Sequence, residues 1–202
     1  MQERLNAYFD VLNALPAATE ATGPSGQATT LAAAFGWAIG TAHAAHEKGG
    51  KLMIIGNGGS AGIASHLAID FSKNGGLRAL AFNDPAALTC LGNDLGYENV
   101  FAMQIAFHAR PGDLLIAISS SGRSPNILKA VEEARARGCV ILTLSGFGAD
   151  NPLRCSGDMN LYVPSSSYGF VEITHLALCH ALLDLSVGWK PDAQVPCARG
   201  AG

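Results

Sequence analysis

The chain has 202 residues, of which 49% are hydrophobic, and a net charge of -3. This length is enough to bury a sizeable core and lies near the upper end for a single domain. The charges form no block of one sign, which argues against a nucleic-acid or membrane-surface binder. We therefore expect the partners to be small molecules or further copies of the chain.

The N-terminal stretch "MQERLNAYFDVLNALP" carries charges in its first turn, and no later stretch approaches the roughly 18 apolar residues of a membrane span. The cysteines are odd in number and widely spaced without a Cys-x-x-Cys pair, which disfavours a disulfide framework and a zinc ribbon. We expect a cytoplasmic protein.

Two helical stretches come first, at about residues 2–15 and 29–48. Between them lies "ATGPSGQ", in which Gly23, Pro24 and Gly26 interrupt the helical pattern. The second stretch is apolar around much of its circumference. Such a helix needs burial, either in the core of its own chain or against another subunit.

From Lys51 onwards, short apolar runs alternate with helical stretches. The runs are 51–56, 78–82, 113–119, 139–145 and 159–164, and the helices are expected to begin near Ser60, Asp84, Ser124, Asn151 and Tyr168. This alternation predicts an α/β fold with a parallel sheet covered by helices on both faces. We expect one domain over residues 1–188, including the N-terminal helices within 1–48, and a C-terminal tail over 189–202.

Two loops that directly follow predicted strands have the composition of anion-binding sites. They are Gly56–Ser60, with adjacent glycines, and Ser119–Ser124, with four serines in six residues. Glycines let the backbone approach an anion, and helix starts and hydroxyls supply donors. The alternative is that Ser124 only caps a helix and that the glycines only make a turn. Four serines exceed what a cap requires, so we favour phosphate binding.

Neither loop is a nucleotide fingerprint. Ala61 stands where the third glycine of G-x-G-x-x-G belongs, and no Walker-type Gly-Lys-Ser/Thr follows the loop. The sequence therefore disfavours dinucleotides and nucleoside triphosphates as ligands.

A set of ionisable residues lies on two of the predicted helices. His66 and Asp70 are four residues apart and share one helix face. Glu172 and His180 are eight residues apart, two turns along roughly one side of the last helix, with His175 as the runner-up. Two histidines and two carboxylates suit Zn²⁺. The alternative is that a histidine on such an apolar helix is simply buried with a hydrogen-bond partner.

The motifs "IIGNGGSAGIASHLAIDF", "CLGND", "ISSSGRSPNILKAV" and "HLALCH" resemble the sugar isomerase (SIS) domain family, and most closely its phosphoheptose isomerases. The resemblance covers about residues 52–185, and the preceding helices match the family's N-terminal extension. It implies a three-layer, flavodoxin-like sandwich with a five-stranded parallel sheet and an N-terminal helical extension. It also implies a homotetramer with active sites shared between subunits.

The resemblance assigns roles to particular residues. It implies one zinc ion per subunit, held by His66, Asp70, Glu172 and His180, with Asp70 as the base and His180 as the acid. The implied substrate contacts are Asn57, Gly58, Gly59, Ser60, Asp94, Ser119, Ser120, Ser121, Ser124 and Glu172.

Two of these positions depart from the family pattern. Asp70 replaces a longer glutamate, so the base reaches less far, and Glu172 replaces a neutral glutamine, so a bound zinc would face a second carboxylate and act as a weaker Lewis acid.

The function that the resemblance implies is the isomerisation of a phosphorylated sugar, sedoheptulose 7-phosphate to D-glycero-D-manno-heptose 7-phosphate. The alternative is a non-catalytic SIS-domain protein, which binds a phosphosugar or regulates as a replication-initiator-associated protein. The substitutions at Asp70 and Glu172 favour this alternative, whereas the retained His66 and His180 count against it.

Overall fold

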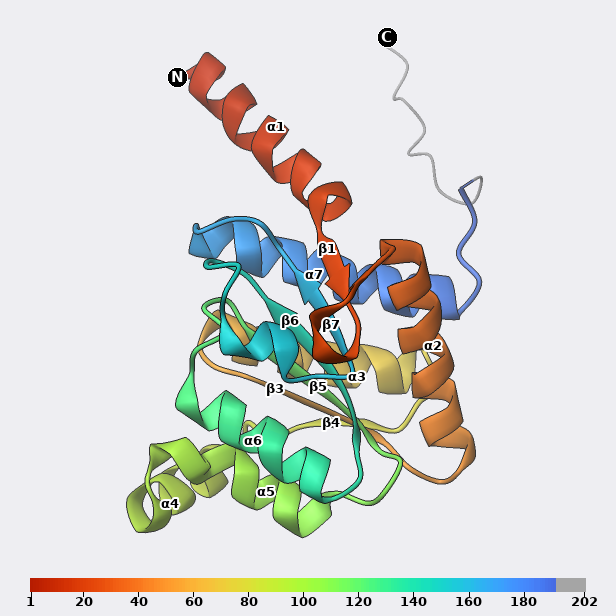
Figure 1. Cartoon of the computed structure of the whole chain (residues 1–202), viewed down its shortest axis with the longest axis vertical. Helices are drawn as coiled ribbons and strands as arrows, with labels where there is room; N and C mark the ends of the chain where they lie inside the picture. Colours follow the sequence, from red (N-terminus) through yellow and green to blue (C-terminus); the bar gives the residue numbers. More distant parts are fainter. Residues whose placement is uncertain (192–202) are drawn as a thin grey trace, which may run out of the picture.

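The computed structural model describes residues 1–191, which fold around one seven-stranded sheet in the order β2-β1-β7-β6-β5-β3-β4 (Figure 1). Five strands run parallel, as their pairings show. They are β3 (Leu52–Gly56), β4 (Ala79–Ala81), β5 (Leu114–Ser119), β6 (Val140–Ser145) and β7 (Met159–Tyr162). These strands correspond to the five predicted apolar runs, and their order is that of a flavodoxin-like sheet.

The predicted five-stranded parallel sheet is confirmed, but the whole sheet has seven strands, because two short antiparallel strands extend it beyond β7. They are β1 (Glu20–Thr22), which pairs antiparallel with β7, and β2 (Ala28–Thr29), which pairs antiparallel with β1. Segments of three and two residues are too short to show the alternation of a strand. The sequence therefore suggested only a linker here.

Helices cover both faces of the sheet. On one face lie α2 (Leu31–Glu47), α3 (Gly59–Lys73) and α7 (Tyr168–Ser186), and on the other lie α5 (Val100–His108) and α6 (Pro125–Ala136). α4 (Pro85–Leu95) packs beside α5, and α1 (Gln2–Ala18) contacts α7 and projects from the body (Figure 1). Short 3₁₀ turns occupy Pro24–Gly26, Tyr97–Asn99 and Pro152–Cys155.

Two helix expectations differ from the structure. The helix expected near Asn151 is only the 3₁₀ turn Pro152–Cys155, and α5 has no counterpart among the predicted helices. The sequence of α5, "VFAMQIAFH", is apolar on nearly every side, so it carries little helical periodicity from which to predict it.

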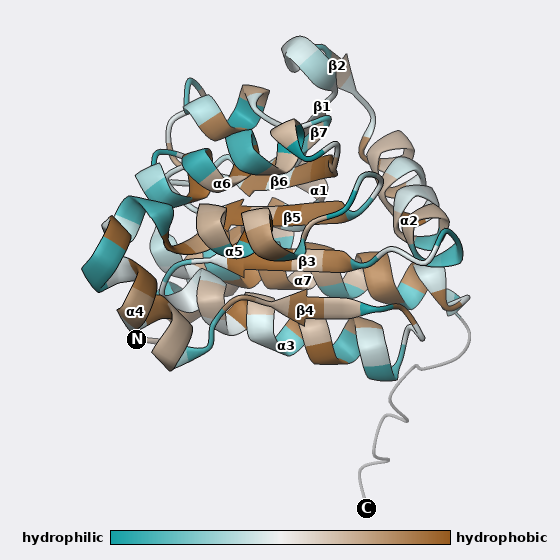
Figure 2. Cartoon of the chain, turned by 90° about the horizontal axis from the view of Figure 1, so that it is seen from below, coloured by the Kyte–Doolittle hydropathy of each residue, from teal (hydrophilic) through white to brown (hydrophobic). Residues whose placement is uncertain are grey.

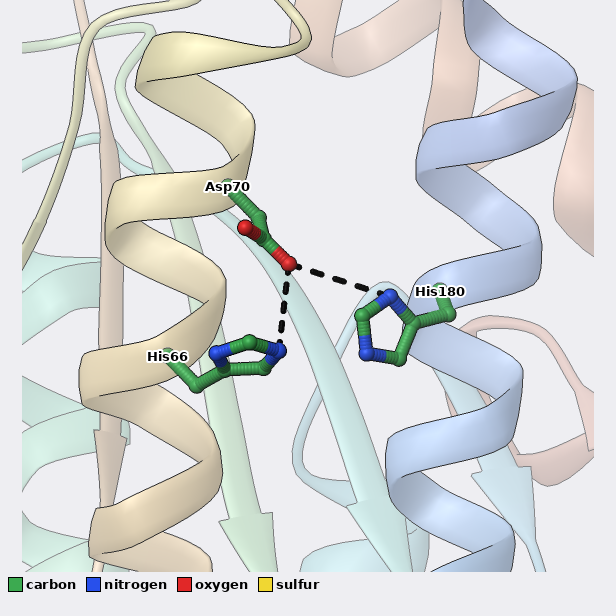
Figure 3. Close-up of side chains that lie close together, drawn as sticks. All are labelled: His66, Asp70 and His180. Carbon is green, nitrogen blue, oxygen red and sulfur yellow. Dashed lines mark ion pairs between the residues drawn. The ribbon is translucent and has the colours of Figure 1, made fainter.

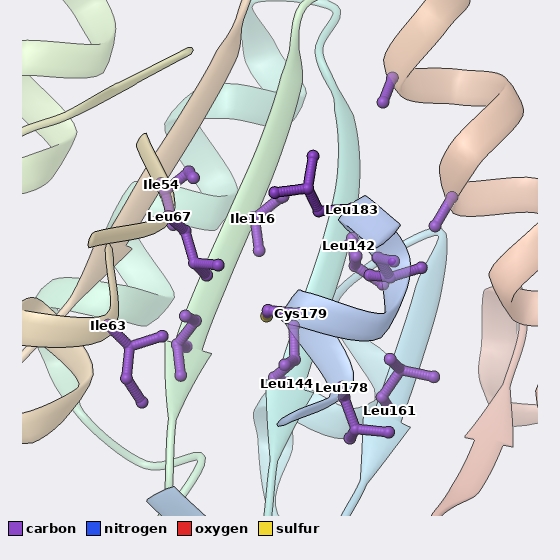
Figure 4. Packing of buried hydrophobic residues seen from close by; sticks show 14 of the residues in the cluster. Ile54, Ile63, Leu67, Ile116, Leu142, Leu144, Leu161, Leu178, Cys179 and Leu183 are labelled. Carbon is purple, nitrogen blue, oxygen red and sulfur yellow. The ribbon is translucent and has the colours of Figure 1, made fainter. Parts of the chain in front are cut away.

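The strands are buried on both faces, which explains their continuous apolar runs. In β3, Leu52 and Ile54 pack under α2, α3 and α7, whereas Met53 and Ile55 pack under α5 and α6. Figure 4 shows the first of these clusters, and Figure 2 shows the apolar strands lying between more polar outer layers.

The two N-terminal helices differ in burial. α2 buries Ala34, Phe35, Ala38, Ala42 and Ala45 within its own chain, so its apolar character is explained without another subunit. α1 instead leaves four large apolar side chains between 44% and 49% exposed, namely Leu5, Tyr8, Phe9 and Val11.

Within the described residues, no helix is both long enough and apolar enough to cross a membrane. The domain boundary at residue 188 stays a prediction, and most of the expected tail, from residue 192, lies outside the described part of the chain.

Candidate active site

The sheet topology brings the two predicted anion-binding loops together. β3 lies between β4 and β5 and runs parallel to both, so the carboxyl ends of β3 and β5 flank the point where the strand order reverses. Ligands bind at this position in open α/β sheets. The loops after β3 and β5 meet there, with Gly56 paired to Ile118 at the strand ends.

A hollow of about 230 Å³ lies between these loops and the start of α7. Its lining residues are Asn57, Gly58, Gly59, Ser60, Ile118, Ser119, Ser120, Ser121, Ser124, Tyr168 and Glu172. Every predicted substrate contact except Asp94 is in this set. Asp94 is on α4, where Asn93 donates to its carboxylate, and it does not line the hollow.

The serine loop is arranged for more than capping a helix. The hydroxyls of Ser119 and Ser124 are 3.2 Å apart, and Ser124, at the N-cap of α6, makes no side-chain capping bond. Ser120 lines the hollow with a buried hydroxyl that has no hydrogen-bond partner among the described residues. Because buried polar groups are normally paired, this hydroxyl is a candidate contact for a ligand in the hollow.

The backbone of the loop is held in one unusual conformation. Gly122 has φ of 61°, and its N–H donates to the carbonyl of Ser119 at 3.0 Å. A Cβ at this glycine would lie less than 3.0 Å from the side chain of Asn151, and Leu153 donates its N–H to the Gly122 carbonyl at 3.1 Å. The segment after β6 thus fixes the position of the serine loop.

Charge in the hollow is distributed unevenly. Glu172 is the one charged residue among the lining residues, and its carboxylate lies against Gly59 at the first turn of α3. Arg123 points away to form an ion pair with Asp150 at 2.8 Å. The positive end of the α3 dipole is therefore already next to a negative charge, the carboxylate of Glu172. The serine hydroxyls and the start of α6 therefore remain for a second anion.

A second cluster lies further along α3 and α7 (Figure 3). One ligand atom each from His66, Asp70 and His180 lie within 4.8 Å of one another. Oδ2 of Asp70 is 3.2 Å from Nε2 of His66 and 3.8 Å from Nδ1 of His180. The structure thus brings together three of the four predicted ligands. Glu172 does not join them, because it lies two turns earlier on α7 beside the hollow.

His175, the runner-up on α7, has a structural role. It is fully buried, and its Nε2–H donates to the carbonyl of Ser145 at 3.1 Å. Burial lowers the pKa of its imidazole to about 4, with the bond to Ser145 acting weakly in the opposite direction. The alternative of a buried, hydrogen-bonded histidine on an apolar helix thus holds for His175 and not for His180.

Sequence reasoning missed Tyr168, which lines the hollow at the first residue of α7 and packs edge-on against Phe147. Its only sequence signal is its place at the start of a helix after "PSSS", which is too weak to indicate a ligand contact.

Comparison with known proteins agrees with this geometry. The SIS domain family model matches residues 25–146, which is more than half of the chain, so the chain belongs to the SIS domain family. Within that family it is similar to the phosphoheptose isomerase of Rhodospirillum rubrum, with 38% identity over 76% of this chain and 85% of the relative. The phosphoheptose isomerase of Solidesulfovibrio magneticus is 43% identical over 68% of this chain and 70% of the relative.

Solved structures give the same result. The phosphoheptose isomerase of Neisseria gonorrhoeae superposes with a TM-score of 0.77 at 30% identity, covering 92% of this chain and 98% of that one. That of Francisella tularensis gives 0.79 at 30% identity, covering 92% and 97%. The predicted resemblance to the phosphoheptose isomerases is therefore confirmed.

Proposed function

We propose that the protein is an aldose–ketose isomerase that converts sedoheptulose 7-phosphate into D-glycero-D-manno-heptose 7-phosphate. The observation that carries this proposal is the placement of two sites along α3 and α7, an anion hollow at the serine loop and the cluster of His66, Asp70 and His180. Isomerisation through an enediol requires fixed phosphate placement, a carboxylate near the carbon acid and a group that moves protons at oxygen.

The phosphate would lie at the serine loop, away from the carboxylate of Glu172. Hydroxyls and the helix start of α6 would hold it without a lysine or arginine, since the lining residues include neither. The first carbons of the sugar would then extend along α3 towards Asp70. Glu172 and Asp94 are proposed as contacts to sugar hydroxyls.

Two groups, Asp70 and His180, are sufficient for all four proton transfers of the isomerisation, and both return to their starting protonation states. Asp70 would take a proton from C1 of the ketose while His180 gives one to O2, which forms the enediol. His180 would then accept the proton from O1 as Asp70 returns its proton to C2. The contacts of Asp70 with His66 and His180 orient its carboxylate for this exchange.

The cluster also fits a zinc ion. Two imidazole nitrogens and a carboxylate oxygen are common zinc ligands, and ligands about 2.0–2.1 Å from a tetrahedral zinc lie about 3.3–3.4 Å from each other. The contacts of Asp70 at 3.2 and 3.8 Å are close to that spacing. We propose one zinc per subunit on His66, Asp70 and His180, without Glu172, which lies beside the hollow two helical turns away. Bound zinc would polarise the substrate oxygens.

We also propose a homotetramer in the cytoplasm, where phosphorylated sugars are metabolised. The exposed apolar side chains of α1 are the support, because a projecting helix with such a face is an aggregation liability unless another copy covers it. We therefore expect the subunit contact on α1, since the apolar face of α2 is already buried in its own chain.

Turnover of sedoheptulose 7-phosphate, followed by NMR, tests the function. The expected result is the appearance of the aldose anomeric signals, their loss in His180→Ala, and their persistence in His108→Ala, which removes an exposed histidine far from the cluster. Tight binding of heptose phosphates without turnover would instead support the non-catalytic alternative. That alternative is not favoured, because the compared relatives are all named as isomerases.

A further inference from the structure

Two asparagine side chains join the loops that form the hollow. Asn57, in the loop after β3, donates from Nδ2 to Oδ1 of Asn126 at 2.9 Å. Asn126, in the first turn of α6, donates from Nδ2 to Oδ1 of Asn57 at 2.8 Å. The pair links positions 69 residues apart in the sequence. Asn126 is only 1% exposed and does not line the hollow, whereas Asn57 does.

Tyr97 adds a third hydrogen bond to this pair. Its hydroxyl donates to Oδ1 of Asn57 at 3.2 Å from the 3₁₀ turn between α4 and α5. An amide oxygen has two acceptor sites and an amide nitrogen has two donor hydrogens. Both acceptor sites of Asn57 are therefore used, and one N–H remains. Because Asn57 lines the hollow, its side chain can act on a ligand there as a hydrogen-bond donor.

A donor suits what the hollow is proposed to hold. Phosphate and sugar oxygens accept hydrogen bonds, and a donor already fixed in place loses no rotamer freedom when the ligand binds. Without Asn126, the Asn57 amide could rotate and turn its oxygen towards an anion. That orientation would repel the ligand.

We propose that Asn126 is a positioning residue for the proposed isomerase reaction, which acts on the substrate only through Asn57 by holding its free N–H towards the hollow. The inference rests on the proposed function, and it extends the site beyond the residues that line it. Tyr97 donates to the same oxygen of Asn57 and contributes less, because Tyr97 is 61% exposed and its bond is longer.

A double-mutant cycle separates positioning from general stabilisation. The variants are Asn57→Ala, Asn126→Ala and the double variant, and the dissociation constants of sedoheptulose 7-phosphate and of inorganic phosphate are measured by calorimetry. We expect each single variant to raise the dissociation constant of the sugar phosphate about 10-fold, the scale of one hydrogen bond to a charged group. The double variant is expected to match Asn57→Ala within about 2-fold, because Asn126 has no effect once the amide is gone.

Asn160→Ala is the matched control. Asn160 is equally buried, at 1% exposure, but bonds to Thr143 and Ser145 outside the hollow. The Asn160→Ala variant should lower the melting temperature without changing the dissociation constant of sedoheptulose 7-phosphate or of inorganic phosphate. If Asn126→Ala does not fold, Asn126→Leu removes the same hydrogen bonds and keeps the side-chain volume. Tyr97→Phe, at an exposed position, removes the other bond to the Asn57 amide and is expected to raise the dissociation constant of the sugar phosphate about 3-fold.

The results of this cycle distinguish a failure of the inference from a failure of the proposed function. Fold-changes that multiply to about 100-fold in the double variant would mean that Asn126 acts independently of Asn57, and would overturn the inference. Unchanged binding in folded variants at Asn126 and Tyr97 would do the same while leaving the proposed function intact. A wild-type chain that binds neither sedoheptulose 7-phosphate nor phosphate would overturn the proposed function and this inference together.

Discussion

Replacing Gly122 by alanine tests whether the segment after β6 holds the serine loop. The backbone there has φ of 61°, which costs a residue with a Cβ about 1–2 kcal/mol. The new Cβ would also displace the Asn151 side chain, which donates to the carbonyls of Gly146 and Gly148 and accepts from the N–H of Arg154. Each of these bonds contributes about 1 kcal/mol. We expect Gly122→Ala to lower the free energy of unfolding by about 4–5 kcal/mol if all three bonds are lost.

Gly112→Ala is the control, because it measures only the cost of placing a residue with a Cβ at a positive φ. Gly112 has φ of 87°, and a Cβ there would meet no atom within 4 Å. We expect a loss of only about 1–2 kcal/mol. Urea denaturation at one fixed protein concentration measures both variants, because subunit association would make the apparent stability depend on concentration. If the two variants lose the same stability, Asn151 does not hold the loop and the reasoning fails.

Four further predictions concern the site and the assembly. Ser121→Ala combined with Ser124→Ala should weaken phosphosugar binding by about 1–3 kcal/mol in calorimetry, and unchanged binding would refute the phosphate role of the loop. A chelator should lower the melting temperature, and added zinc should restore it. His180→Ala should abolish this response to chelator and zinc. His175→Ala should lower the stability but leave the response intact. Light scattering should give about four times the chain mass of 20.8 kDa, and a monomer at micromolar concentration would contradict the tetramer. Burial lowers the pKa of His175 in the folded protein to about 4, whereas in the unfolded chain this imidazole binds a proton below about pH 6.5. The free energy of unfolding should therefore fall by about 3 kcal/mol as the pH is lowered from about 6.5 to about 4. His175→Gln should remove this fall from the plot of stability against pH.

Much of the fold was predictable because its signals are local. The strands β3, β5 and β6 are continuous apolar runs, and the glycines and serines after β3 and β5 mark the loops that line the hollow. The i, i+4 spacing of His66 and Asp70 likewise places both side chains on one face of their helix from the sequence alone. On α7, spacing put His180 on roughly the same side as Glu172 and left His175 as an alternative, and the family resemblance favoured His180.

Other features depend on contacts between distant parts of the chain. The strand β1 forms because β7 and β2 are available for pairing, and its three residues carry no pattern of their own. The position of the Glu172 carboxylate against Gly59, beside the hollow, follows from how α7 packs along α3, which the sequence does not show. The pairing of Asn57 with Asn126 across 69 positions is equally invisible in the sequence.

A crystal structure of the zinc-loaded protein with sedoheptulose 7-phosphate tests whether the hollow and the histidine cluster bind the two ends of one substrate. We expect the phosphate among Ser119, Ser121 and Ser124, with the first two carbons of the sugar extending along α3 to the cluster of Asp70 and His180. A phosphate bound away from the serine loop, or a sugar whose first carbons point away from that cluster, would contradict it.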